Sequence, residues 1–212
     1  MLDKSIPLKK VIMRLEAKNN TCNVPSLPVG FKYRFFENGD EYHWARIETS
    51  VLEFHHEDAA VEYFSKEFLP YPSEIKRRCV FIVSPDGLPI ATTTAWFRNV
   101  GNERYGQLHW VAVCPEYQGM GLGKAVVQKV LTVFQELEPG RDIWLGTQTW
   151  SHVAIRMYYK LGFRLVREET VDLSSNVLPR RVKTKYDIDA ALEILKNVYE
   201  DDFYQELVST IL

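Results

Sequence analysis

The sequence predicts a mixed α/β fold, in which a central and mostly antiparallel sheet carries helices on both faces. The length of 212 residues suits one compact domain. Apolar residues recur with strand and helix periods, but three strand-like runs follow one another between residues 79 and 114. The third run then passes through glycines directly into a helix. A strictly alternating parallel fold is therefore not expected.

The first third of the chain predicts two strands followed by two helices. Residues 10–15 alternate like a strand, and residues 19–30 hold the prolines and glycine of a loop. Residues 31–36 predict the next strand. The turn after it offers Asp40 as the N-cap of an amphipathic helix, whose apolar positions are Trp44, Ile47, Val51 and Leu52. A second helix over residues 57–68 is ended by Pro70 and Pro72.

The middle of the chain predicts an antiparallel hairpin. Residues 79–83 and 89–97 read as strands, and they flank the turn sequence Ser84-Pro85-Asp86-Gly87. A third strand is expected over residues 107–114. The polar residues 98–106 predict a loop before it.

The last part predicts two helix and strand pairs and a helical tail. A helix follows Gly123 up to Pro139-Gly140, and residues 143–147 form a strand. A helix over residues 151–161 and a strand over 163–171 come next, and residues 187–212 read as one or two helices. We therefore expect an N-terminal strand and loop (1–30), a main domain (31–171) and a C-terminal helical extension (172–212).

Bulk composition excludes several partners. The formal net charge is −2, so no global field would attract nucleic acid or an anionic membrane. No apolar run is long enough for a membrane span or a signal peptide, which predicts a cytoplasmic protein. The three cysteines lack the spacing of a disulfide framework or a zinc site. The run His55-His56-Glu57-Asp58 has no further ligand at structural spacing, so no metal is expected.

The glycine-rich turn has the character of a phosphate-binding loop. Backbone N–H groups at a helix N-terminus can hold an anion, and glycine permits close approach. Gln118 and Ala125 break the P-loop pattern of nucleoside triphosphate enzymes, and Lys124 stands where a dinucleotide fingerprint needs its third glycine. The alternative is a turn that only lets the helix pack closely.

The pattern Gln118-x-x-Gly121-x-Gly123 resembles the pyrophosphate loop of the Gcn5-related N-acetyltransferases (GNAT). The resemblance implies a GNAT-like fold and acetyl-CoA as co-substrate. It also implies that the strand backbone at Val111, Ala112 and Val113 binds the pantetheine arm. The loop amides that would hold the pyrophosphate are those of Gln118, Gly119, Met120, Gly121, Leu122, Gly123 and Lys124.

The segment from Ser151 to Phe163 resembles the closing motif of the same family, a helix that runs into Tyr-x-Lys-Leu-Gly-Phe. Ser151 stands where the family usually has asparagine, so the resemblance implies a weaker or absent side-chain contact to the pantetheine arm. Tyr158 matches the tyrosine aimed at the thioester sulfur, and a neutral phenol can protonate a departing thiolate. The alternative for Tyr158 is a core residue. Tyr159 points elsewhere around the helix and is expected to pack.

The general base is expected on the strand before the loop. Strand alternation would put Gln107, His109, Val111 and Val113 on one face, and the run from Leu108 to Val113 resembles the arylalkylamine branch, where a histidine in the matching place serves. A packed core histidine is the alternative. Glu48 and Glu53 are the alternative candidates for the base, because the helices after the first strand commonly wall the acceptor cleft in the family that the sequence resembles. Trp150 is a candidate for the border of this cleft.

Together these features predict an N-acetyltransferase that moves an acetyl group from acetyl-CoA to a small-molecule or peptide amine by direct attack in a ternary complex. A non-catalytic acyl-CoA sensor and a transferase of longer acyl groups are the alternatives. The apolar stripe of the tail can pack on its own domain, cap the acceptor cleft or form a homodimer.

Overall fold

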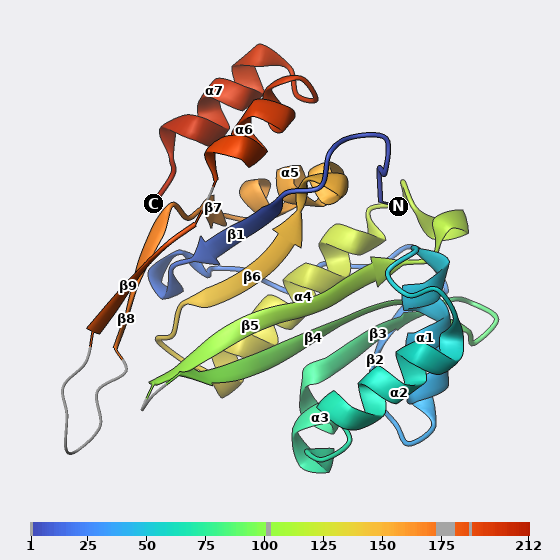
Figure 1. Cartoon of the computed structure of the whole chain (residues 1–212). Helices are drawn as coiled ribbons and strands as arrows, with labels where there is room; N and C mark the ends of the chain where they lie inside the picture. Colours follow the sequence, from blue (N-terminus) through green and yellow to red (C-terminus); the bar gives the residue numbers. More distant parts are fainter. Residues whose placement is uncertain (1, 101–102, 173–180, 187) are drawn as a thin grey trace. The chain divides into compact units, whose positions relative to one another are not determined.

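A computed structural model of the chain describes residues 2–100, 103–172, 181–186 and 188–212 (Figure 1). Its strands are β1 Lys10–Leu15, β2 Lys32–Phe35, β3 Cys79–Val83, β4 Pro89–Val100, β5 Glu103–Val113, β6 Ile143–Gln148, β7 Arg164–Leu165, β8 Glu168–Asp172 and β9 Arg181–Lys185. Its α-helices are α1 Asp40–Ser50, α2 Glu57–Glu67, α3 Pro72–Arg78, α4 Leu122–Leu137, α5 His152–Lys160, α6 Asp189–Lys196 and α7 Asp201–Ser209.

The main sheet has seven strands in the order β2-β3-β4-β5-β6-β1-β7, and β8 and β9 form a separate pair. The β5–β6 ladder is parallel at Gly106↔Ile143 and Gln107↔Trp144. The ladders β2–β3, β3–β4, β1–β6 and β1–β7 are antiparallel. The predicted fold class, a mixed and mostly antiparallel sheet with helices, is confirmed.

The chain divides into two compact units. The first contains residues 21–96 and 108–138, and the second contains residues 2–20, 97–107 and 139–212. The expected division into an N-terminal strand and loop, a main domain and a C-terminal extension, with boundaries after residues 30 and 171, stays a prediction.

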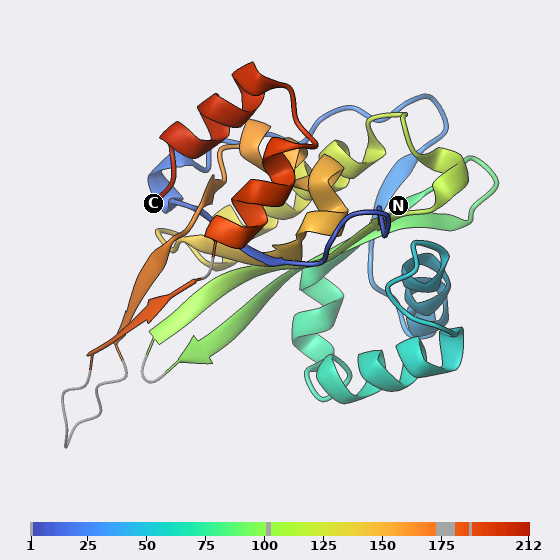
Figure 2. The same ribbon diagram turned by 45° about the horizontal axis from the view of Figure 1, so that its top comes forward.

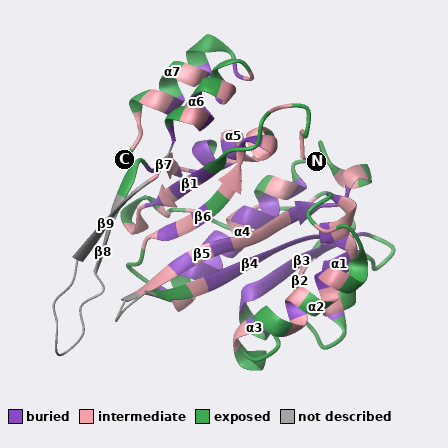
Figure 3. Ribbon diagram, viewed as in Figure 1, coloured by how far each residue is buried: buried purple, intermediate pink, exposed green. Residues whose placement is uncertain are grey.

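The first unit is built around β3, whose five residues are all buried. Both faces of this strand are therefore covered, and Figure 3 shows it in the buried colour along its length. Trp44 of α1 packs on Phe64 of α2 and on Phe68, the C-cap of α2, with ring centroids 5.1 and 6.1 Å apart. At the end of α4, the buried Glu138 accepts a hydrogen bond of 2.7 Å from the guanidinium of Arg78. These contacts join the helices of this unit to one another.

Asp40 corrects the first helix assignment. The N-cap of α1 is Gly39, with φ at 100°, and its helix begins at Asp40. The Asp40 carboxylate instead accepts two hydrogen bonds from Arg34, of 2.8 and 2.7 Å, and one of 2.7 Å from the N–H of Glu37. Charge-assisted bidentate hydrogen bonds are strong and geometrically specific, so Asp40 connects Arg34 of β2 to the turn before α1.

Three further elements differ from the predictions. Pro72 is the first residue of the short helix α3. Proline is favourable at this position because the N–H group that it lacks would have no acceptor within the helix. The polar residues 98–106 belong largely to β4 and β5, and the two residues between these strands lie outside the described part. The single strand expected at 163–171 is divided into β7 and β8, and β9 adds a strand to the segment expected to be helical.

The tail helices pack within the second unit, beside α5 (Figure 2). Tyr199 donates a hydrogen bond of 2.6 Å to the carbonyl of His152. Arg156 pairs with Glu200 at 2.9 Å, and its guanidinium lies over the Phe203 ring at 4.5 Å. The predicted tail helices are confirmed. Leu192, Leu195 and Leu207 of the predicted apolar stripe are buried, and its other positions are half-buried.

Replacing Leu207 by alanine should lower the free energy of unfolding by about 2–5 kcal/mol, because its fully buried side chain would leave a cavity. Urea unfolding measures this change. Val153→Ala is the control, since Val153 of α5 is 70% exposed and its loss should cost under about 0.5 kcal/mol. Equal stability of the Leu207→Ala and wild-type proteins would show that α7 is not part of this core.

Candidate active site

The glycine turn at the start of α4 has the backbone of an anion-binding loop. A short 3-10 turn, Pro115–Tyr117, follows β5, and Gly121 is the N-cap of α4. Gly119 and Gly121 both have φ at 78°, a left-handed conformation that side chains disfavour. A Cβ built on either glycine would meet nothing within 4 Å. The turn therefore presents bare backbone to open space.

Several donors of this loop have no protein acceptor. The N–H groups of Gly119, Met120 and Gly121 make no hydrogen bond to any residue that the structure describes. The first N–H groups of a helix also lack intrahelical acceptors, and the first turn of α4 holds no acidic residue. The Gln118 side chain donates a hydrogen bond of 2.9 Å to the Val113 carbonyl and so fixes the loop to the end of β5. These features fit a pyrophosphate, and the exposed Lys124 adds a positive charge.

The strand before the loop is irregular, which corrects one prediction. Trp110 has φ at 53°, so strict alternation along β5 is interrupted there. His109 and Trp110 consequently both reach Tyr63 of α2, at 3.4 and 3.3 Å. The expected common face from Gln107 to Val113 is wrong, since the side-chain register shifts by one at Trp110. The contact of Cys114 is consistent with this shift, because its Sγ accepts a hydrogen bond from Arg46 of α1.

His109 is neutral at physiological pH. Burial lowers its pKa to about 4. The indole N–H of Trp110 can only donate, so the Tyr63 oxygen accepts it and its hydroxyl can donate to Nε2 of His109. This assignment places the imidazole proton on Nδ1. The sequence does not single out Tyr63 as a site residue. Its only signal in the sequence is that a polar aromatic residue stands one helical turn after Ala60, next to the predicted apolar face.

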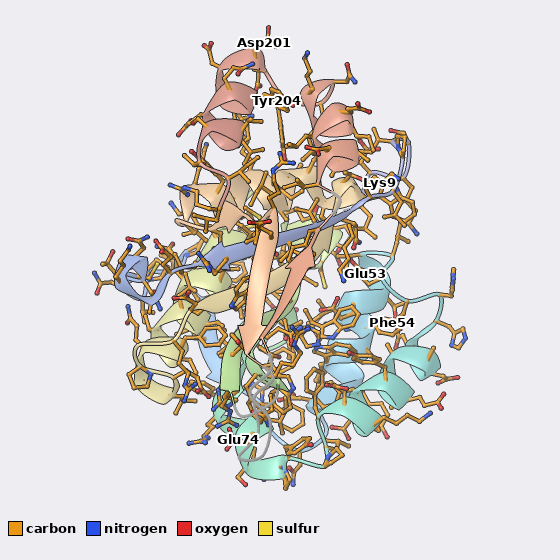
Figure 4. The ribbon with its side chains drawn as sticks, turned by 60° about the vertical axis from the view of Figure 1, so that its left-hand side comes forward. Lys9, Glu53, Phe54, Glu74, Asp201 and Tyr204 are labelled. Atoms are coloured by element: carbon orange, nitrogen blue, oxygen red, sulfur yellow. The ribbon has the colours of Figure 1, made fainter. Side chains whose placement is uncertain are left out.

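Glu48 is the most unusual carboxyl group of the first unit. Its side chain lies on α1 at 1% exposure, and neither carboxyl oxygen has a hydrogen-bond partner among the described residues. Burial, and secondarily the charge of Glu53, raises the pKa of Glu48 well above its ordinary value. Glu53 itself is exposed and lies beside Phe54 after the end of α1 (Figure 4). Of the two glutamates that the sequence predicts for an acceptor cleft, only Glu48 has the perturbed environment typical of functional carboxyls.

The second family motif lies in the second unit. Tyr158 is buried on α5, and its ring packs edge-on against Phe163 at 5.9 Å. Tyr159 packs as predicted, since its hydroxyl donates to the Glu206 carbonyl at 3.3 Å and its ring contacts Phe203. The role of Tyr158 at a thioester stays a prediction.

The residues just before α5 have structural contacts. Ser151 ends a 3-10 turn, Thr149–Ser151, and is half-buried. Trp150 donates a hydrogen bond of 2.7 Å from its indole N–H to the Ile6 carbonyl, and the ammonium of Lys4 lies 5.4 Å from its ring. The indole N–H of Trp150 is thus engaged by the N-terminal segment, and its predicted place at an acceptor border receives no support from these contacts.

Within the described ranges no group of three histidine, cysteine or acidic residues is arranged to hold a metal ion. His56 serves as the N-cap of α2, where its Nδ1 accepts a hydrogen bond of 3.2 Å from the N–H of Ala59. No helix of the described residues has the length and apolar character needed to cross a bilayer.

Comparison with known proteins defines the class. The sequence profile of the acetyltransferase (GNAT) family matches residues 38–163, so the chain belongs to this family. A mycothiol acetyltransferase of Actinosynnema mirum is 30% identical over 141 residues, which are 66% of this chain and 46% of that protein. An uncharacterized N-acetyltransferase of Methanocaldococcus jannaschii is 27% identical over 89 residues, covering 39% of this chain and 38% of that protein. The chain thus spans about half the length or less of these curated relatives.

Solved structures show the same fold. A GCN5-related N-acetyltransferase from Sphaerobacter thermophilus matches with a TM-score of 0.58 and 17% identity, covering 85% of this chain and 52% of that chain. A tandem GNAT protein from the clavulanic acid biosynthesis pathway matches with a TM-score of 0.54 and 20% identity, covering 76% of this chain and 51% of that one.

Proposed function

We propose that the chain catalyses transfer of an acetyl group from acetyl-CoA to an amine, by direct attack within a ternary complex. The observation that carries the proposal is the glycine turn, whose bare N–H groups at the start of α4 form an anion cradle. Membership of the GNAT family and relatives named as acetyltransferases support acyl transfer in general. They leave the acceptor amine unspecified.

The loop residues would hold the co-substrate. The amides from Gln118 to Lys124 would bind its pyrophosphate, and the backbone of Val111, Ala112 and Val113 would bind the pantetheine arm. Acetyl-CoA supplies an activated thioester, so the protein needs no nucleophile of its own. Ser151 in the second motif would add at most a weak side-chain contact.

Two proton transfers remain for the protein. A lysine-like amine is cationic at pH 7, and freeing its lone pair costs about 4.6 kcal/mol. We assign His109 as the base that takes the amine proton, because its imidazole is neutral at that pH. To accept this proton, Nε2 of His109 must exchange the Tyr63 hydroxyl for the amine. Tyr158 would give its phenolic proton to the sulfur as the carbon–sulfur bond breaks. Glu48 is the second candidate for the base, since it is a buried carboxyl without a partner among the described residues.

The pH dependence of kcat/KM separates the two bases. Because burial lowers the pKa of His109 to about 4, activity should be lost only as the pH falls through about 4. If Glu48 is the base, kcat/KM should instead fall at a higher pH, because burial raises the pKa of Glu48 well above 4.5. Replacing His109 by glutamine should therefore lower kcat/KM by about 10²-fold and remove the acidic limb.

Glu48→Gln is the matched variant for this experiment, because it removes the titrating group and keeps the side-chain volume. It should retain the limb near pH 4. If the acidic limb of the pH profile lies above pH 4.5, disappears in Glu48→Gln and persists in His109→Gln, the base is Glu48 rather than His109.

A panel of amines tests the activity itself, with release of free CoA thiol as the readout. Transfer predicts thiol release that depends on both the amine and acetyl-CoA. Binding of acetyl-CoA without thiol release across the panel would favour an acyl-CoA sensor. Faster thiol release from longer acyl-CoA thioesters than from acetyl-CoA would show that the acyl donor is a longer acyl-CoA.

A further inference from the structure

The second unit contains a pocket that the proposed catalytic residues do not use. Its volume is about 170 Å³, and it lies where residues of β1, β4, β5 and β6 come together. The residues that line it are Lys10, Ile12, Arg98, Tyr105, Gly106, Gln107, Trp144, Leu145, Gly146 and Tyr186. A pocket of this size accepts a small molecule or the end group of a larger one.

The charged groups of the pocket are all positive. Lys10 and Arg98 line it, and no acidic residue does. Neither cation forms an ion pair or side-chain hydrogen bond with a residue in the described part of the chain. The neighbouring Arg14, in contrast, lies 3.7 Å from the carboxylate of Asp142. Two cations left without a carboxylate at one small pocket attract an anion.

The walls of the pocket are aromatic and aliphatic. The rings of Tyr105 and Trp144 meet edge-on with centroids 6.4 Å apart, and Ile12 lies opposite Gly146 in the β1–β6 ladder. The indole N–H of Trp144 is buried and has no hydrogen-bond acceptor among the described residues. It is therefore a further donor in a side chain that lines the pocket. Such walls suit a carbon skeleton better than a fully hydrated inorganic ion.

Gly146 keeps part of this space open. A Cβ at this position would meet one atom, Cδ1 of Ile12, at an ordinary contact distance of 3.6 Å. A larger side chain could thus be added without backbone strain, and it would occupy a pocket-lining position. This provides a way to fill the pocket while both cations remain.

We propose that this pocket binds a small organic carboxylate. Arg98 and Lys10 would pair with the carboxylate, and Arg98 can do so with two parallel hydrogen bonds. Trp144, Tyr105 and Ile12 would contact the carbon skeleton. The proposal concerns a site in the second unit and does not depend on the identity of the acetyl acceptor.

Titration with sodium propionate, followed by the indole N–H signals of the ¹⁵N-labelled full chain, tests the proposal. The Trp144 signal is assigned with Trp144→Phe. Propionate should shift that signal saturably at constant ionic strength, and sodium chloride should not. Arg98→Gln and Lys10→Gln should each weaken binding about tenfold or more, and Gly146→Val should abolish it.

Lys9→Gln is the matched control, because it removes the same charge from the residue next to Lys10 and Lys9 is not among the residues that line the pocket. It should bind propionate like the wild type. No saturable shift of the Trp144 signal would overturn the proposal, and so would equal affinity in Lys9→Gln and Arg98→Gln. Saturable binding of inorganic phosphate without binding of propionate would overturn the assignment to an organic carboxylate.

Discussion

Gly121→Val should abolish acetyl-CoA binding and leave the fold intact. Gly121 has φ at 78°, and its missing side chain leaves open space beside the loop amides. A valine there would put a branched side chain where the pyrophosphate must approach. The left-handed conformation would also cost about 1–2 kcal/mol, and relief of that strain would turn the amides away. Calorimetric titration measures the loss, and circular dichroism checks the fold.

Gly140→Val is the control for strain alone. Gly140 has φ at 73°, and a Cβ built there also meets nothing within 4 Å. It follows the C-terminal end of α4, whereas Gly121 stands at the N-terminal end. The two variants should lose similar stability, but Gly140→Val should bind acetyl-CoA like the wild type. Unchanged affinity in a folded Gly121→Val protein would remove the loop from the site.

Tyr158→Phe should lower kcat by about 10²-fold or more, with little effect on acetyl-CoA affinity. The change removes a phenolic proton that is needed only as the thiolate departs, and it keeps the ring that packs against Phe163. Steady-state kinetics and calorimetry on the same protein separate turnover from binding.

Tyr159→Phe is the matched control, because it deletes a hydroxyl from the next residue of the same helix. That hydroxyl donates to Glu206 and belongs to the contact with α7. Its loss should lower the free energy of unfolding by about 1 kcal/mol and leave kcat unchanged. Wild-type kcat in Tyr158→Phe would assign Tyr158 to the core.

The sequence predicts those features that depend on residues close together in the chain. The hairpin of β3 and β4 follows from apolar periods around a turn with Gly87, and the bounds of β1 are those expected from alternation. The glycine turn before α4 is predicted from its glycines, of which Gly119 and Gly121 adopt the left-handed conformation, whereas Gly123 lies within α4. Local chemistry determines each of these features.

Other features depend on contacts that periodicity does not contain. Trp110 adopts a positive φ without a glycine or proline signal, so the register shift beyond His109 was not predictable. Glu48 was named as a candidate from its helix, but its complete burial follows from tertiary packing. Residues 98–100 of β4 and 103–106 of β5 look like a loop in the sequence because a strand with an exposed face is also polar. The contact of Tyr63 with both His109 and Trp110 likewise joins distant segments.

Calorimetric titration of the wild-type chain with acetyl-CoA tests the central claim most directly, namely that the turn before α4 is a coenzyme A site. We expect saturable binding of one acetyl-CoA per chain, competed by CoA, because the pyrophosphate that the loop amides hold is common to both. A titration without binding heat at several temperatures, on a protein shown to be folded, would contradict the account.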